Sequence, residues 1–148
     1  AAIHGVARGA ETILASAELL ARERQTVESL SGGEAQRLIL AAATIHDPAL
    51  VFLDEPTANL DPENRRTLGA RIKALGARAT VVVSTHDLRE AGEVCDEIVF
   101  LVGGAVKAHG PREALIASVP AAARRGDGLE DAFFHFCASR LSPAGTLE

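Results

Sequence analysis

Two short apolar runs constrain the fold of this chain more than any other feature. Residues 49–53 read ALVFL and residues 79–84 read ATVVVS, so each run is only five or six residues long. Their length and their β-forming residues predict strands buried on both faces, as in parallel sheets. Because a helical pattern separates the two runs, the sequence predicts an α/β fold with a mostly parallel sheet.

The other predicted elements follow from caps and periodicity. Asp61 suits the N-cap of the helix between the strands, and Pro62 suits its first position. The pair Gly103-Gly104 predicts a hairpin turn. Further helices are predicted over residues 10–24, 34–45, 86–94, 111–117 and 129–140, and the hairpin strands over residues 97–102 and 105–108.

Composition excludes several classes of protein. The 148 residues contain no run of 18 apolar residues, so we expect no transmembrane helix, and the first residues lack the pattern of a signal peptide. A net charge of −5 argues against nucleic acid as the main partner. Cys95 and Cys137 form neither a disulfide framework nor a zinc site, and we expect buried, reduced thiols.

Two carboxylates follow the first apolar run directly. Asp54 and Glu55 stand where α/β sheets place their ligands, at the C-terminal end of a buried strand. Asp54 can hold Mg²⁺ directly or through water, and Glu55 can orient or deprotonate an attacking water. The alternative is an acidic pair that only ends the strand and caps the next turn.

Two further motifs suit phosphate. Ser31, Gly32, Gly33 and Glu34 combine an N-cap serine with glycines that allow close approach, and a helix N-terminus binds anions. His86 follows the second strand and can hydrogen-bond a phosphate oxygen or a water. Taken alone, the first motif is more simply a serine-capped helix, and a lone histidine is more often structural.

Together these motifs resemble the ATP-binding-cassette (ABC) ATPase family. LSGGE at 30–34 looks like its signature motif, LVFLDEP at 50–56 like Walker B, ANLD at 58–61 like the D-loop, and STHD at 84–87 like the switch-histidine motif. The resemblance covers about residues 1–117 and depends on the order and spacing of all four motifs. It implies a partial P-loop NTPase core plus a helical signature subdomain.

The resemblance also implies roles for single residues. Ser31, Gly32, Gly33 and Glu34 would approach the γ-phosphate of an ATP held by a second, head-to-tail subunit, and Asp61 would communicate across that interface. In the complete domain, the family uses ATP with Mg²⁺. Asp54 would support the metal, Glu55 would polarise the attacking water, and His86 would touch the γ-phosphate.

One essential motif of that family is missing from the sequence. No G-x-x-x-x-G-K-[S/T] occurs, since neither lysine, Lys73 or Lys107, follows a glycine, and neither Gln25 nor Gln36 is placed as a Q-loop glutamine. The chain also contains no methionine, and its start resembles the stretch after the Q-loop. We therefore expect the C-terminal portion of an ABC nucleotide-binding domain, inactive by itself, divided into residues 1–48, 49–117 and 118–148.

Partners and location follow from the same resemblance. The complete protein would form a homo- or heterodimer of nucleotide-binding domains, would dock on a membrane permease, and would be cytoplasmic at the inner face of the membrane. The sequences EPTANLD at 55–61 and STHDLREA at 84–91, and the absence of coiled-coil heptads around the signature, favour a transporter over a DNA-repair or chromosome ATPase. A non-catalytic module that supplies the signature in trans to another subunit remains a third alternative.

The missing half of the domain would leave a face and an edge of the sheet uncovered. We therefore expect the chain to dimerise, to swap structural elements between copies, or to be only marginally soluble.

Overall fold

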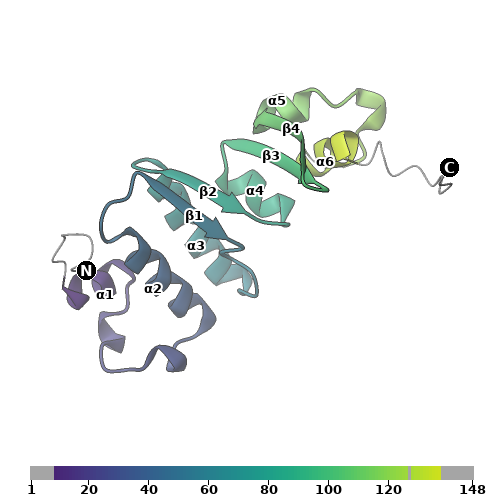
Figure 1. Ribbon diagram of the computed structural model, residues 1–148. Helices are drawn as coiled ribbons and strands as arrows, with labels where there is room; N and C mark the ends of the chain where they lie inside the picture. The colour runs from purple at the N-terminus through teal and green to yellow at the C-terminus, as the bar shows by residue number, and fades with distance from the viewer. Residues whose placement is uncertain (1–8, 127, 138–148) are drawn as a thin grey trace, which may run out of the picture. The chain divides into compact units, whose positions relative to one another are not determined.

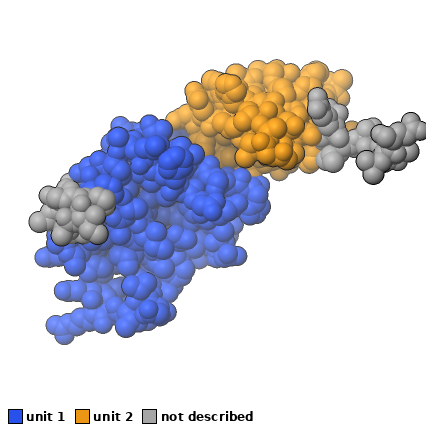
Figure 2. All heavy atoms as spheres, in the orientation of Figure 1, with its two compact units in different colours: residues 1–86 blue, residues 87–148 orange. Residues whose placement is uncertain are grey.

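The computed structural model describes residues 9–126 and 128–137 of the chain. It divides into two compact units, residues 1–86 and residues 87–148, which Figure 2 shows in different colours. Each unit is described separately below. The three-part division expected from the sequence stays a prediction.

The first unit combines a helical region with a strand–helix–strand unit (Figure 1). Its helices α1 and α2 pack together, and α2 packs on α3. The elements are α1 (Ala10–Ser16), η2 (Leu20–Arg22), η3 (Val27–Ser29), α2 (Gly32–Thr44), β1 (Leu50–Asp54), α3 (Pro62–Gly76) and β2 (Thr80–Ser84).

Strands β1 and β2 pair in parallel, with Asp54 opposite Ser84 at their C-terminal ends. The connection between them is α3, whose buried side chains include Leu68, Ile72 and Leu75 at helical spacing. This arrangement confirms the predicted α/β class and its parallel strands. It also places the ends of both strands at one edge of the sheet, because parallel strands run in the same direction.

The burial of the two strands differs from the prediction. Val51 is buried, but its neighbours Leu50 and Phe52 are 49% and 72% exposed, and Val82, the register partner of Phe52, is 44% exposed. Successive residues of a strand point to opposite faces, so Leu50 and Phe52 share a face, and Val82 lies on the same face because it pairs with Phe52. The prediction of strands buried on both faces is therefore wrong: within the described residues, only the other face is covered.

The first helix is much shorter than its apolar spacing predicts. It ends at Ser16 because Glu18 adopts a left-handed backbone conformation (φ 59°), which breaks the helical hydrogen-bond pattern. Ala17 and Leu19 are nevertheless buried. The guanidinium of Arg37 donates to the carbonyl of Ala17 at 3.2 Å, so α2 holds the chain where α1 ends.

The second unit is a hairpin covered by helices. It contains α4 (Leu88–Val94), β3 (Glu97–Val102), β4 (Ala105–Pro111), α5 (Arg112–Ala117), η4 (Ala121–Ala123) and α6 (Leu129–Cys137). Gly103 and Gly104 both have positive φ, as a two-residue hairpin turn requires, and this confirms the predicted turn. The part of the helix predicted over 129–140 that follows Cys137 lies outside the described residues.

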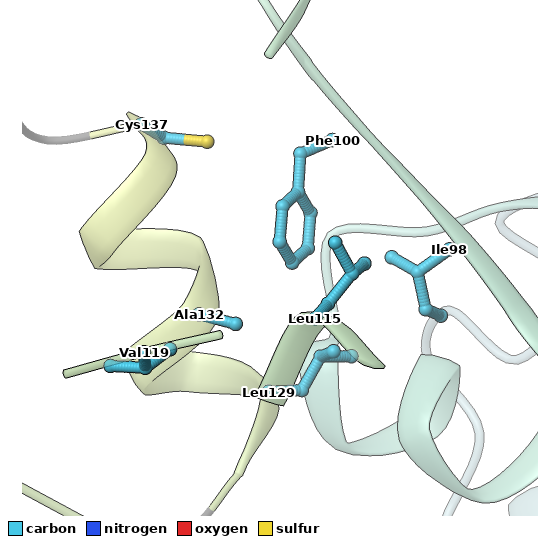
Figure 3. Close-up of a cluster of buried hydrophobic side chains, with 7 residues drawn as sticks. All are labelled: Ile98, Phe100, Leu115, Val119, Leu129, Ala132 and Cys137. Atoms are coloured by element: carbon cyan, nitrogen blue, oxygen red, sulfur yellow. The ribbon is translucent and has the colours of Figure 1, made fainter. Parts of the chain in front are cut away.

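A compact apolar core holds this unit together. Figure 3 shows its side chains converging from β3, α5, the segment after α5, and α6; they are Ile98, Phe100, Leu115, Val119, Leu129, Ala132 and Cys137. The ring of Phe100 meets that of Phe133 edge to face, with 5.5 Å between their centres. Both cysteines are free thiols; Cys137 is buried as expected, but Cys95 is only half-buried. None of the described helices is long and apolar enough to cross a membrane.

Candidate functional site

The carboxylate of Asp54 lies where β1 ends, beside the end of β2. Its strand partner Ser84 donates a hydrogen bond from its hydroxyl to the Asp54 Oδ1 atom. Both side chains are exposed, so an incoming ligand can reach them. The sheet register therefore places a carboxylate and a hydroxyl oxygen together at the C-terminal ends of the two strands, which is where the sequence predicts the ligand site.

Glu55 adopts an unusual backbone conformation immediately after this edge. Its φ of 45° is left-handed, which is uncommon for a residue other than glycine and is found at many functional sites. Its N–H still donates to the Ser84 carbonyl at 2.9 Å, so the strand pairing continues for one residue more. Because Glu55 directly follows β1 and makes this hydrogen bond, its backbone is held against β2.

The structure joins Glu55 to His86. The Oε1 atom of Glu55 accepts the backbone N–H of His86 at 3.1 Å and lies 2.7 Å from the His86 Nδ1 atom. The His86 side chain is 85% exposed and that of Glu55 is 38% exposed. Two of the residues selected from the sequence therefore form one contact, with a carboxylate that is oriented but open to water.

Residues 31–34 form the start of α2, which begins at Gly32, two residues before the predicted range of 34–45, while the predicted N-cap is confirmed. Ser31 is the N-cap: its hydroxyl accepts the Glu34 N–H at 3.3 Å, while the Glu34 carboxylate accepts the Ser31 N–H at 2.9 Å. This reciprocal capping box fixes the first turn. The Ser31 N–H holds the pKa of the Glu34 carboxyl below its ordinary value; the Ser31 hydroxyl and Arg22 act in the same direction.

Position 33 requires glycine for a packing reason that the sequence alone does not reveal. It is buried against Asn64 of α3, and a Cβ on Gly33 would lie 2.9 Å from the Asn64 Cβ and closer still to its amide group. The same Asn64 accepts a hydrogen bond from Arg37 at 3.3 Å and donates one to Asp61 at 2.6 Å. Asn64 therefore connects α2 to Asp61.

Asp61 caps the other helix of this region. Its Oδ1 atom accepts the N–H groups of Glu63 at 3.1 Å and of Asn64 at 2.9 Å, which confirms the predicted N-cap. The backbone N–H of Asn64 has the largest effect in holding the pKa of the Asp61 carboxyl below its usual range, and the Asn64 side chain adds to it. The carboxylate is thus ionised and in a fixed position.

The interactions of the selected residues form two groups within the first unit. One contains Asp54, Glu55 and His86 at the strand edge, with Ser84 added by the structure. The other contains the signature residues and Asp61, with Arg22, Arg37 and Asn64 added. The sequence motifs miss the roles of both Asn64 and Ser84, although the position of Asn64 three residues after an N-cap and the position of Ser84 at a strand end could have pointed to them. No periodicity points to Arg22, which lies 12 residues before Glu34.

The strand edge provides oxygen ligands for a small hard cation. No group of three or more His, Cys, Asp or Glu side chains in the described part of the chain could hold a metal ion. Mg²⁺, however, is commonly bound through one or two carboxylates plus water and substrate phosphates. The Asp54 carboxylate and the Ser84 hydroxyl fit that limited role.

Comparisons with known proteins point to ABC transporter ATP-binding proteins. Residues 5–58 match the family model described as ABC transporter. The chain is 40% identical over 109 residues to the Nod factor export ATP-binding protein I of Neorhizobium galegae, covering 73% of this chain and 31% of the relative. It is 44% identical over 90 residues to the phosphate import ATP-binding protein PstB 2 of Natronomonas pharaonis, covering 60% and 32%. The chain thus spans about a third of the length of these curated relatives.

Solved structures support the same fold. The structure described as the ATP-binding subunit of an ABC transporter superposes with a TM-score of 0.67 at 29% identity, covering 84% of this chain and 51% of that one. An inward-facing metal-chelate type ABC transporter gives a TM-score of 0.62 at 26% identity, covering 72% and 46%. The α/β fold with parallel strands is therefore that of ABC ATP-binding subunits.

Proposed function

Since the chain is a homologue of the ATP-binding subunits of ABC transporters, we propose that it is the signature- and Walker B-bearing part of such a subunit. In the complete protein, this subunit hydrolyses ATP to drive a substrate across a membrane. The proposal depends mainly on the contact between Glu55 and His86, which lies beside Asp54. The same unit contains the capped helix that begins in the LSGGE motif.

The strand-edge residues prepare the hydrolytic step. Bound Mg²⁺ would supply charge neutralisation of the phosphates, and Asp54 with Ser84 would hold it. Glu55 orients an attacking water and takes up its proton at a carboxylate oxygen. The His86 backbone N–H holds that carboxylate in place, and the imidazole, which is 85% exposed, would contact the γ-phosphate. Phosphoryl transfer depends mostly on such positioning.

The signature residues act on a nucleotide held elsewhere. The N–H groups at the start of α2, which Ser31 caps, and the Ser31 hydroxyl would face the γ-phosphate of an ATP bound by a second subunit, as the positive end of a helix favours. Gly32 and Gly33 keep the backbone accessible, Glu34 completes the cap, and Asp61 relays contact across the interface. Residues 1–48, 49–117 and 118–148 are then the helical subdomain, the Walker B half of the core and a C-terminal connection.

The proposed partners are a second nucleotide-binding domain and a membrane permease. The complete subunit would act in the cytoplasm, at the inner face of the membrane. One relative is named for export and another for import, so likeness to them does not determine the direction of transport. The permease selects the substrate.

Phosphate release and nucleotide binding by the pure chain test this proposal. The sequence contains no G-x-x-x-x-G-K-[S/T], so we expect no phosphate release and only weak binding of MgATP. When MgATP is titrated into the chain at constant ionic strength, the amide NMR signals of residues 31–34, 54, 55 and 86 should shift. Turnover by the pure chain that Glu55→Gln abolishes, or no response in any of these residues, would overturn the proposal.

A further inference from the structure

Glu34 introduces a negative charge at the end of α2 where phosphate is proposed to approach. Its carboxylate accepts the Ser31 N–H at 2.9 Å, and this hydrogen bond lowers the pKa of the carboxyl, so the group is ionised at neutral pH. A carboxylate at this position stabilises the helix. It also offsets the positive helix end and repels a phosphate.

Arg22 supplies the opposite charge. It lies in η2, and its Nε atom donates to the Oε1 atom of Glu34 at 3.1 Å. The other carboxylate oxygen, Oε2, accepts the Ser31 N–H, so both oxygens of Glu34 have a partner. The Glu34 side chain is only 17% exposed, while that of Arg22 is 47% exposed. The two charges therefore cancel, and Glu34 is less exposed to solvent than Arg22.

We propose that Arg22 is a positioning residue of the signature: it neutralises Glu34 and so lets the start of α2 attract a phosphate. Arg22 acts through Glu34 and does not itself contact the nucleotide. This inference depends on the proposed function, because it concerns the same phosphate-facing helix end. It adds a residue from outside the LSGGE motif to the recognition of the nucleotide.

A double-variant cycle tests the inference. The chain and its variants are titrated with MgATP at constant ionic strength, and the amide signals of Gly32 and Gly33 report binding. We expect Arg22→Ala to weaken binding roughly three- to tenfold, since an uncompensated carboxylate then opposes the helix end. Glutamine keeps the capping box without the charge, so Arg22→Ala/Glu34→Gln should restore the wild-type affinity.

The controls separate this inference from simpler explanations. Arg24→Ala removes an equally charged, exposed residue of the same segment and should leave the affinity unchanged. If Arg22→Ala alone has no effect, only the role of Arg22 is overturned. If Glu34→Gln fails to restore binding, Arg22 contacts the phosphate directly and charge compensation is wrong. If the wild-type amides of Gly32 and Gly33 do not respond at all, the phosphate-facing role of the signature fails together with this inference.

Discussion

Gly33 illustrates how a residue can be selected correctly from the sequence for an incomplete reason. The motif suggests a glycine that allows a phosphate to approach. In the structure the Gly33 Cα also lies against the Asn64 side chain, which links to Asp61 and Arg37. This second requirement joins residues 31 positions apart, so local pattern alone does not reveal it. The same limit applies to Arg22 and Glu34.

Replacing Gly33 with alanine should therefore destabilise the first unit. The new Cβ would lie 2.9 Å from the Asn64 Cβ, a distance that forces the helices apart and costs about 1–3 kcal/mol in free energy of unfolding. Urea unfolding followed by circular dichroism measures this cost. Gly76→Ala is the matched control, since a Cβ there meets nothing within 4 Å and should not destabilise the chain. A stable Gly33→Ala chain would show that Asn64 moves aside freely.

The sequence predicts the N-caps of helices more accurately than it predicts where helices end or which faces of the strands are buried. Ser31 and Asp61 cap α2 and α3 as expected, because a cap depends on a few adjacent residues. The end of α1 depends instead on the left-handed Glu18 and on carbonyls held by arginines from other helices. Such contacts are decided by the fold, and the apolar spacing of residues 10–24 contains no sign of them.

The Asp61 cap should make the unfolding of the chain depend on pH. Hydrogen bonds from Asn64 and Glu63 lower the pKa of Asp61 in the folded state below the ordinary value of 3.8. A lowered folded pKa stabilises the fold above the unfolded value, and this contribution disappears as the pH falls through the folded value. Asp61→Asn keeps an accepting oxygen for the cap but cannot titrate.

The wild-type chain should therefore lose more stability than Asp61→Asn between neutral pH and pH values below the ordinary pKa of the carboxyl. The urea midpoint at several pH values measures the difference. Other carboxyls with lowered pKa values, including Glu34, are common to both chains and cancel in the comparison. Equal acid sensitivity of the two chains would contradict a titrating cap.

At the scale of the whole molecule, strand identity was predictable but strand environment was not. The runs at 49–53 and 79–84 form a parallel pair over Leu50–Asp54 and Thr80–Ser84, as their β-forming residues and the helical pattern between them predict. An apolar run has enough hydrophobic side chains for two faces, yet only the face bearing Val51 is covered in the described residues. Which surface covers a strand is a property of the assembled sheet, and the composition of the strand does not determine it.

The uncovered face should make the chain self-associate. Leu50, Phe52 and Val82 share this face, and Phe52, the largest of them, is 72% exposed. β1 and β2 also pair only with each other among the described strands, so each has a free edge. Both features favour contacts between copies of the chain. The weight-average mass should therefore rise with protein concentration in sedimentation velocity experiments.

Phe52→Ser should suppress this rise without loss of fold, because an exposed side chain contributes little to the free energy of unfolding. Val27→Ser is the control: Val27 is also apolar and 57% exposed, but it belongs to η3 and not to the sheet. If only Phe52→Ser lowers the association, the sheet face mediates it. If both variants lower it equally, general hydrophobicity is responsible, and a wild-type chain that stays monomeric at every concentration would show that the face tolerates water.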